Sequence, residues 1–259
     1  MPVATAPSTP AFAELLRAIG LAEVAASPAT LQQRVDRKYV VPLETVELLV
    51  GRLRGSHRLL TIDGRSSFRY RTVYYDTPDL ASFREHVQGR RRRFKCRSRV
   101  YADSGEHWLE VKLKGPHGRT DKRRLSCDPL PPGLLSGPGL DFLRASVADA
   151  YGRPAPILMR PSVRMDYRRT TLVASELGER LTCDVGLTFG GSRGLRDGFA
   201  IVESKSARGR ASADRALLAL GARPVADCSK YCLGVALTVP EARDNRLRPL
   251  LRAYFDTGR

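Results

Sequence analysis

Charged and apolar positions alternate residue by residue along several stretches of this chain. The clearest stretch is 109–113, where leucine and valine at the odd positions alternate with Glu110 and Lys112. Successive side chains of a β-strand point to opposite faces, so this pattern predicts a strand with one apolar and one charged face. The same alternation, with aromatic and β-branched residues, predicts strands at 31–41, 67–76, 90–101, 107–114, 119–127, 159–174, 180–190 and 198–205.

Apolar residues spaced three or four positions apart predict a smaller number of helices. Pro42 suits a first helical turn, the segment 77–79 favours a helix entry, and Ser229 suits an N-terminal cap. Gly221 is a stop signal. The predicted helices cover 11–24, 42–53, 80–89, 140–150, 212–220 and 229–238.

The order of these elements predicts an α+β fold. Turn residues at 103–105 and 115–118 join neighbouring strands into hairpins, and long βαβ alternation, the signature of a parallel sheet, is absent. We expect a flexible tail and helix at 1–29, one domain at 30–240 and a charged tail at 241–259.

The charges lie within the strands, where they share faces. Lys95, Arg97 and Arg99 share one face, and Trp108–Lys112 and Ile201–Lys205 repeat one pattern of apolar residues around a Glu-x-Lys pair. In a single strand, the solvated face of an amphipathic sheet is the simpler interpretation. Across six strands the excess of Lys and Arg favours the basic lining of a closed antiparallel barrel whose apolar face lies beneath helices.

The excess of basic residues indicates an anionic binding partner but does not identify which one. The 259 residues carry 44 Lys and Arg against 27 Asp and Glu, a net charge of +17. Such an excess favours a polyanion, which could be nucleic acid, an anionic membrane surface or a phosphorylated molecule or polymer. The five cysteines show no zinc-finger spacing and indicate free thiols in a reducing compartment. We expect a cytoplasmic protein, since we find neither a signal peptide nor an apolar run long enough to span a bilayer.

The lining residues suit phosphate chemistry. Arginine offers a rigid fork of donors that matches phosphate oxygens, and lysine adds a compact charge. A few carboxylates among many cations suit Mg²⁺ or Mn²⁺, which bind through one or two carboxylates together with substrate phosphates. A polyphosphate and a metal would also neutralise the like charges that face one another inside a barrel.

Nine segments, in order over roughly 30–240, resemble the VTC-type polyphosphate polymerase domain of the triphosphate tunnel metalloenzyme superfamily. No single segment is specific, but nine in the family order make a strong signal. The segments are Arg34–Tyr39, Tyr70–Pro78, Lys95–Tyr101, Leu109–Lys112, Thr120–Arg124, Tyr167–Thr170, Arg180–Asp184, Val202–Lys205 and Ser229–Tyr231.

The resemblance implies an eight-stranded antiparallel tunnel that transfers the γ-phosphate of ATP to polyphosphate with a divalent metal, Mn²⁺ or Mg²⁺. It implies that Glu203 binds the metal and that Lys230, Lys38 and Glu203 are catalytic. The implied phosphate-binding residues are Lys38, Arg97, Arg99, Lys112, Lys122, Arg169, Arg180 and Lys230.

The first strand departs from the superfamily pattern at two positions, and the choice between Arg168 and Arg169 as the tunnel arginine stays open. Asp36 stands where glutamate is usual, and Arg34 replaces the first acidic residue of the triphosphatase and cyclase branches, which argues against those branches. The resemblance prefers Arg169 as the tunnel arginine, because the family places it two residues after a tyrosine. Simple alternation with Arg164 and Asp166 favours Arg168 instead.

Alternative functions remain. An inorganic or nucleoside triphosphatase of the same fold would let water replace the acceptor, and a polyphosphate-binding module would bind without turnover. Charges interleaved along many strands argue against a nucleic-acid partner, so we interpret Arg90–Arg93 as a tunnel rim. No membrane span is expected, a membrane-protein partner is possible, and the oligomeric state stays open. Trp108 is expected in the outer core, and His57, His86, His107 and His117 are interpreted as surface or structural residues.

Overall fold

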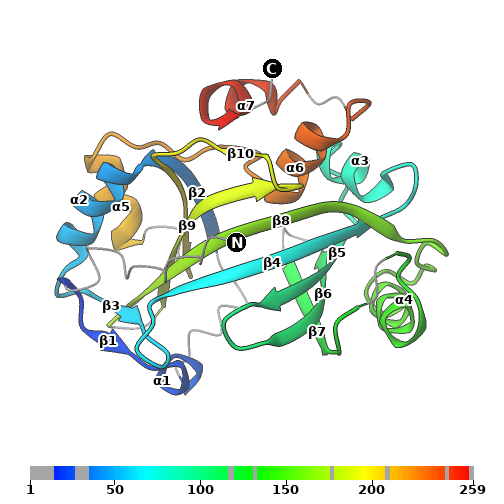
Figure 1. Ribbon diagram of the computed structural model, residues 1–259, viewed down its shortest axis with the longest axis horizontal. Coiled ribbons are helices and arrows are strands. Elements are labelled where there is room, and N and C mark those ends of the chain that lie inside the picture. Colours follow the sequence, from blue (N-terminus) through cyan, green and yellow to red (C-terminus); the bar gives the residue numbers. More distant parts are fainter. Residues whose placement is uncertain are drawn as a thin grey trace, which may run out of the picture. The chain divides into compact units, whose positions relative to one another are not determined.

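Antiparallel strands form the frame of the protein in a computed structural model, which describes residues 15–26, 35–115, 120–130, 133–175, 178–207, 211–242 and 245–256 (Figure 1). The chain forms two compact units. Unit 1 comprises 1–68, 168–186 and 197–226, and unit 2 comprises 69–167, 187–196 and 227–259. Two strands, β8 (Arg160–Ala174) and β9 (Glu179–Phe189), contribute residues to both units.

The sheet of unit 1 is built around β11 (Phe199–Ser206). This strand lies antiparallel between β2 (Val35–Pro42) and β9, and β9 is followed by β8. Short strand β3 (His57–Leu60) pairs antiparallel with the end of β8, and β1 (Ala18–Ile19) pairs parallel with β3. A short helix, α1 (Leu21–Ala26), follows β1.

One face of this sheet is apolar and lies beneath two helices, α2 (Leu43–Leu53) and α5 (Ser212–Ala219) (Figure 1). Its core joins Tyr39, Val202 and Leu181 of the strands with Leu49 of α2 and Leu217 of α5. Since these strand residues alternate with Lys38, Glu203 and Arg180, the charged residues are directed to the opposite face. The sequence prediction of an apolar face beneath helices is confirmed for this unit.

Unit 2 is built on a meander of four strands, β4 (Ser67–Asp76), β5 (Arg93–Tyr101), β6 (Glu106–Lys114) and β7 (Thr120–Ser126), of which β4 starts in unit 1. Strand β8 lies beside β4. Two short strands, β10 (Arg193–Leu195) and β12 (Phe255–Asp256), extend the end of β9.

Helix α4 (Gly137–Tyr151) covers the apolar face of the meander. Leu143 and Val147 of the helix pack with Leu109 and Val111 of β6. The Tyr151 hydroxyl donates to the carbonyl of Arg93 at 2.6 Å and accepts from the amide of Lys114 at 2.9 Å, which fastens the helix end to β5 and β6. The remaining helices of this unit are α3 (Ala81–Val87), α6 (Lys230–Thr238) and α7 (Arg248–Tyr254).

The predicted α+β class and antiparallel pairing are confirmed. The closed barrel is not confirmed, because the strand pairings found within the described ranges do not join into a ring. No helix in the described ranges is long and apolar enough to cross a bilayer. All five cysteines are free, as predicted, and all but Cys127 are buried.

The helix predicted at 11–24 is confirmed only from Leu21 onward. Residues 11–14 lie outside the described residues, 18–19 form a strand, and the helix starts only at Leu21. Ile19 is buried, and the backbone at 17 and 19 accepts hydrogen bonds from Leu59 and Thr61. Pairing with β3 therefore overrides the helical spacing. In the predicted tail after 240, the structure has α7 and β12, with Phe255 fully buried.

Candidate functional site

All nine predicted site residues lie in the described part of the chain. Unit 1 holds Lys38, Arg169, Arg180 and Glu203, and unit 2 holds Arg97, Arg99, Lys112, Lys122 and Lys230. All but Lys230 lie on strands, and each unit has a charged face of its own.

Cross-strand pairing in unit 2 arranges the cations in rows across the sheet. One row is Lys95, Lys112 and Lys122, on β5, β6 and β7. The next row along the strands is Arg97, Glu110 and Arg124. Directly opposite residues on adjacent strands are about 5 Å apart, and rows two residues apart are separated by about 7 Å. This face therefore offers donors at regular intervals in two directions.

Glu110 is the negative centre of this face. It is only 1% exposed, and its carboxylate lies 2.6 Å from Arg97 Nη2, 2.5 Å from Lys122 Nζ and 3.3 Å from Arg124 Nε. Arg99 Nη1 lies 3.7 Å away. Burial alone would raise the pKa of Glu110, but these cations outweigh burial and hold it well below its usual range. One carboxylate thus holds four cations in place.

The pKa of Lys122, whose Nζ contacts Glu110, is lowered. Burial and the nearby guanidinium of Arg97 lower its pKa to about 7, although Glu110 acts in the opposite direction. A bound phosphate would add negative charge and favour the protonated lysine. If a phosphate binds at this face, its binding would therefore be coupled to proton uptake near neutral pH.

Tyrosines orient the two arginines of β5. Arg97 Nη1 donates to the Tyr74 hydroxyl at 3.0 Å, and Arg99 Nη2 donates to the Tyr167 hydroxyl at 3.1 Å. Burial raises the pKa of the Tyr74 hydroxyl, but the charges of Arg97 and Arg99 outweigh this effect and lower it overall. Because guanidinium groups held from two sides lose little further freedom on binding, both arginines are preorganised for an anion.

Lys230 is the first residue of α6, with its Nζ 5.4 Å from the ring centre of Tyr167. The helix is capped by the Ser229 hydroxyl, which accepts from the Cys232 amide and also from Lys95 Nζ at 2.8 Å. Asp76 at the end of β4 accepts a hydrogen bond from the Tyr231 hydroxyl, which fixes the start of the helix. Helix N-termini favour anions, so the position of Lys230 adds backbone dipole to side-chain charge.

In unit 1, Arg169 forms a bidentate pair with Asp184, at 2.6 Å from Nε and 2.7 Å from Nη2. Asp184 alternates with Leu181 and Cys183 of the helix-covered core, so it lies on the charged face together with Arg180. Arg168 lies on the side of Leu172, a core residue. The structure thus assigns Arg169 to the charged face, as the resemblance prefers.

The register around β11 places Glu203 opposite Lys38 of β2 and Thr182 of β9, while Lys205 lies opposite Asp36 and Arg180. Lys205 Nζ is 3.2 Å from Glu203 Oε2. On the opposite face, the Tyr39 hydroxyl donates to Asp214 of α5 at 2.9 Å. This hydrogen bond fixes β2 so that Lys38 is directed to the charged face.

The acidic residues fit a metal only if the substrate supplies ligands. Within the described ranges, no three His, Cys, Asp or Glu side chains gather closely enough to hold an ion. Asp184 and Glu110 are paired with arginines, and Glu203, the carboxylate of the predicted metal site, is paired with Lys205 at 3.2 Å. One carboxylate completed by phosphate oxygens is the usual manner of Mg²⁺ binding, so Glu203 fits such an ion.

Sequence reasoning missed several residues of these faces. It placed Glu110 and Lys95 on charged faces but gave neither a role, and no pattern pointed to the pair of Asp184 with Arg169. It placed Trp108 in the outer core, which is wrong: Trp108 pairs with Arg99 and lies 5.8 Å from the Arg124 guanidinium. Trp108 is two residues from Glu110 on the same strand, and this spacing could have shown that both side chains lie on the charged face.

Comparison with known proteins identifies a family. The model of the VTC domain matches residues 33–239. No curated protein shows significant similarity to the chain.

Among solved structures, a candidate adenylate cyclase from Vibrio parahaemolyticus is 14% identical with a TM-score of 0.42, covering 73% of this chain and 87% of that one. A candidate adenylyl cyclase from Hippeastrum, described as having a dominant triphosphatase activity, is 12% identical with a TM-score of 0.42, covering 82% and 99%.

Proposed function

Because this chain belongs to the VTC-domain family, we propose that it transfers the γ-phosphate of ATP to a growing polyphosphate chain. The observation that carries the proposal is the charged face of unit 2, where four cations surround the buried carboxylate of Glu110. The four cations carry more positive charge than Glu110 can neutralise. A bound phosphate chain would supply the negative charge that is missing.

The spacing of the cations favours a chain over a single phosphate. The lysine row of Lys112 and the arginine row of Arg97 are separated by about 7 Å along the strands. A chain lying along β5 would meet a new row of donors at each such interval. The phosphate-binding role proposed for Lys38, Arg169 and Arg180 in unit 1 rests on the family resemblance and on their positions on a charged face.

Catalysis of phosphoryl transfer consists mainly of positioning and charge stabilisation. The acceptor phosphate is already anionic, so no side chain needs to activate a nucleophile. Lys230, with the N-terminus of α6, and Lys38 are proposed to stabilise the charge on the transferred and leaving phosphates. Glu203 would hold the divalent cation, and that cation, when bound, supplies further charge neutralisation.

The experiment is incubation with ATP and Mn²⁺, with and without a short polyphosphate primer, followed by separation of the products on a gel. The proposal predicts long chains and ADP, both lost in Glu203→Gln and Lys230→Ala. The matched control is Glu47→Gln, the same change on an exposed position of α2, which should leave synthesis intact.

Two results would replace the proposal by another function. Release of phosphate from ATP without chain growth would make the protein a triphosphatase, in which water takes the place of the acceptor. Tight binding of polyphosphate without any turnover would make it a binding module.

A further inference from the structure

The charged face of unit 2 changes in character along its strands. One end is the lysine row of β5, β6 and β7, and the arginine row lies beside it. In the row after the arginines, Trp108 of β6 lies opposite Arg99 of β5. The last row joins Tyr70, Tyr101 and Glu106. Because each step between rows covers about 7 Å, a cationic end and an aromatic end lie on one continuous face.

Trp108 is held in a fixed orientation at the aromatic end but remains partly exposed. Its indole N–H donates to the Glu106 carboxylate at 3.3 Å, and the Arg124 guanidinium lies 5.8 Å from the centre of the ring. Neither contact buries the side chain. A rigid, oriented ring loses little freedom when a planar group stacks on it, so Trp108 is preorganised as a stacking surface.

The ligand that suits this end of the face is an uncharged aromatic group joined to phosphates. Glu106 is exposed and acidic, so it disfavours a further phosphate beside Trp108. Aromatic side chains set among cations are the usual surface on which nucleobases stack, since every base has a π-face and is tethered to phosphate. The arginine row next to Trp108, with Arg97 and Arg124, lies where the phosphates of such a ligand would begin.

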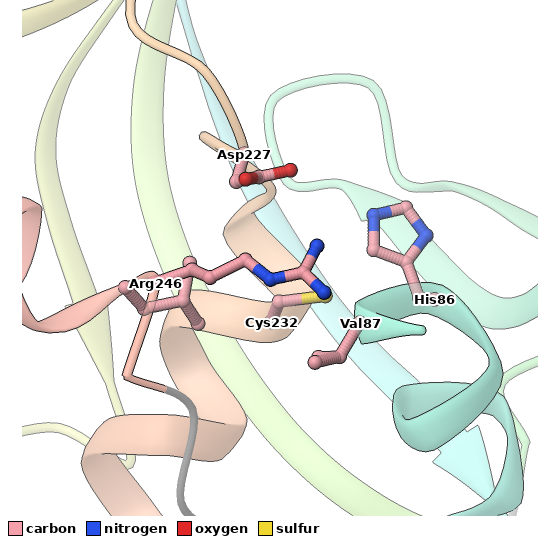
Figure 2. Close-up of a pocket in the computed structure, with 6 residues that line it drawn as sticks. His86, Val87, Asp227, Cys232 and Arg246 are labelled. Atoms are coloured by element: carbon pink, nitrogen blue, oxygen red, sulfur yellow. The ribbon is translucent and has the colours of Figure 1, made fainter. Parts of the chain in front are cut away.

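The opposite end of the face does not suit a base. There, Lys95 Nζ lies 3.3 Å from His86 Nε2, and this histidine borders a small pocket (Figure 2). The pocket is lined by His86, Val87, Asp227, Cys232, Arg246 and Leu247. Its volume open to the centres of water-sized spheres is about 10 Å³, which admits one such group and excludes a nucleobase. The aromatic end is therefore the better place for the base.

We propose that Trp108, held by Glu106 and Arg124, is the platform on which the base of the donor nucleoside triphosphate stacks. The ribose would span the step from Trp108 to the arginine row, and the phosphates would continue from there, with the γ-phosphate towards the lysine row. The inference rests on the proposed function, because its ligand is the proposed phosphate donor. The platform adds recognition of the nucleoside to a site whose predicted residues contact only phosphates and a metal.

The test compares the binding of ATP and of tripolyphosphate to the full-length protein by calorimetry, without divalent metal so that transfer does not interfere. Trp108→Ala should weaken ATP binding about tenfold, which is the contribution of stacking one base. Tripolyphosphate has no base, so its affinity should stay as in the unaltered protein. Trp108→Phe is the matched control, and it should retain most of the ATP affinity because it retains an aromatic ring.

A second measurement needs no variant. Trp108 is the only tryptophan of the chain, so its fluorescence reports on the platform in the unaltered protein. With excitation at wavelengths that adenine does not absorb, saturating ATP should quench this emission more strongly than saturating tripolyphosphate does. Equal changes with the two ligands would refute stacking, and this result decides the question if Trp108→Ala fails to fold.

The outcomes separate the platform from the proposed function. Unchanged ATP affinity in Trp108→Ala would overturn the platform, and so would an equal loss of affinity for ATP and tripolyphosphate, which would mean that Trp108 only supports the phosphate-binding rows. Both results leave the proposed function in place. Failure of the unaltered protein to bind either ligand, with or without Mg²⁺, would overturn the proposed function together with the platform that rests on it.

Discussion

Glu110→Gln is the substitution that most directly tests how the charged face of unit 2 is held together. The change keeps the shape of the side chain and removes its charge from the midst of Arg97, Arg99, Lys122 and Arg124. Removing one partner of a buried ion pair costs about 3–5 kcal/mol, because the remaining charges are left uncompensated. The Lys122 and Arg124 side chains are 31% and 46% exposed, so water screens part of the loss.

We therefore expect Glu110→Gln to lower the free energy of unfolding by about 2–4 kcal/mol. For a chain of this size, that loss lowers the melting temperature by roughly 5–10 °C. The assay is thermal unfolding followed by circular dichroism, with and without tripolyphosphate. Because a phosphate replaces the missing negative charge, tripolyphosphate should stabilise the variant more than the unaltered protein.

The control is Asp149→Asn, which removes an exposed carboxylate paired with Arg123 and should cost less than about 1 kcal/mol. A Glu110→Gln protein as stable as the control would refute the role of Glu110 as the shared counter-ion. So would a destabilised variant that tripolyphosphate stabilises no more than it stabilises the unaltered protein.

The pH dependence of stability provides a second test of the role of Glu110. The folded-state pKa of Glu110 is lowered from 4.5, so the ionised carboxylate stabilises the protein fully above that value. This contribution is lost as the pH falls from 4.5 towards the lowered pKa. Glu110→Gln should therefore show a shallower loss of stability in acid, which unfolding titrations between pH 5 and the onset of acid denaturation would measure.

Three further predictions concern other positions. Since the pKa of Lys122 is about 7, the affinity for tripolyphosphate, measured by calorimetry, should fall as the pH rises through 7. Lys122→Arg should flatten this pH dependence, and an equally steep dependence in the variant would contradict the role of Lys122. Asp184→Asn should lower the free energy of unfolding by about 3–5 kcal/mol in denaturant titrations, because it removes the buried carboxylate that pairs with Arg169, whose side chain is only 14% exposed. A loss below about 1 kcal/mol would argue against the pair. Gly234→Ala should cost about 1–3 kcal/mol in the same titrations, because its Cβ would meet the Val163 and Phe189 side chains at 2.5–2.8 Å; an unchanged midpoint would show that this contact relaxes freely.

The strands and their faces follow from local alternation, which explains why most of them could be predicted. Glu203 and Lys38 alternate with core residues, so their shared face could be read from the sequence. The short strand at 18–19 could not, because two residues carry no periodicity and pair only through the backbone with β3. Periodicity is informative over many residues, whereas a short edge strand depends on tertiary contact.

Contacts between strands distant in sequence set the limit for predicting the site. The composition of β6 shows that Glu110 lies on a charged face, but not that it meets Lys122 as well as Arg97, because register is decided in space. The same holds for Arg169, whose side of β8 became clear only through Asp184. His86 shows no motif at all, and its position between Lys95 and Arg93 comes from the packing of α3 beside β5.

The central claim is that the γ-phosphate of ATP becomes part of a polyphosphate chain. The direct measurement is to supply ATP labelled on that phosphate, with Mn²⁺ and an unlabelled primer, and to follow the label over time. The account predicts label within lengthening chains, and no such label with Glu203→Gln. Label that appears only as free phosphate, at a rate that the primer does not change, would contradict it.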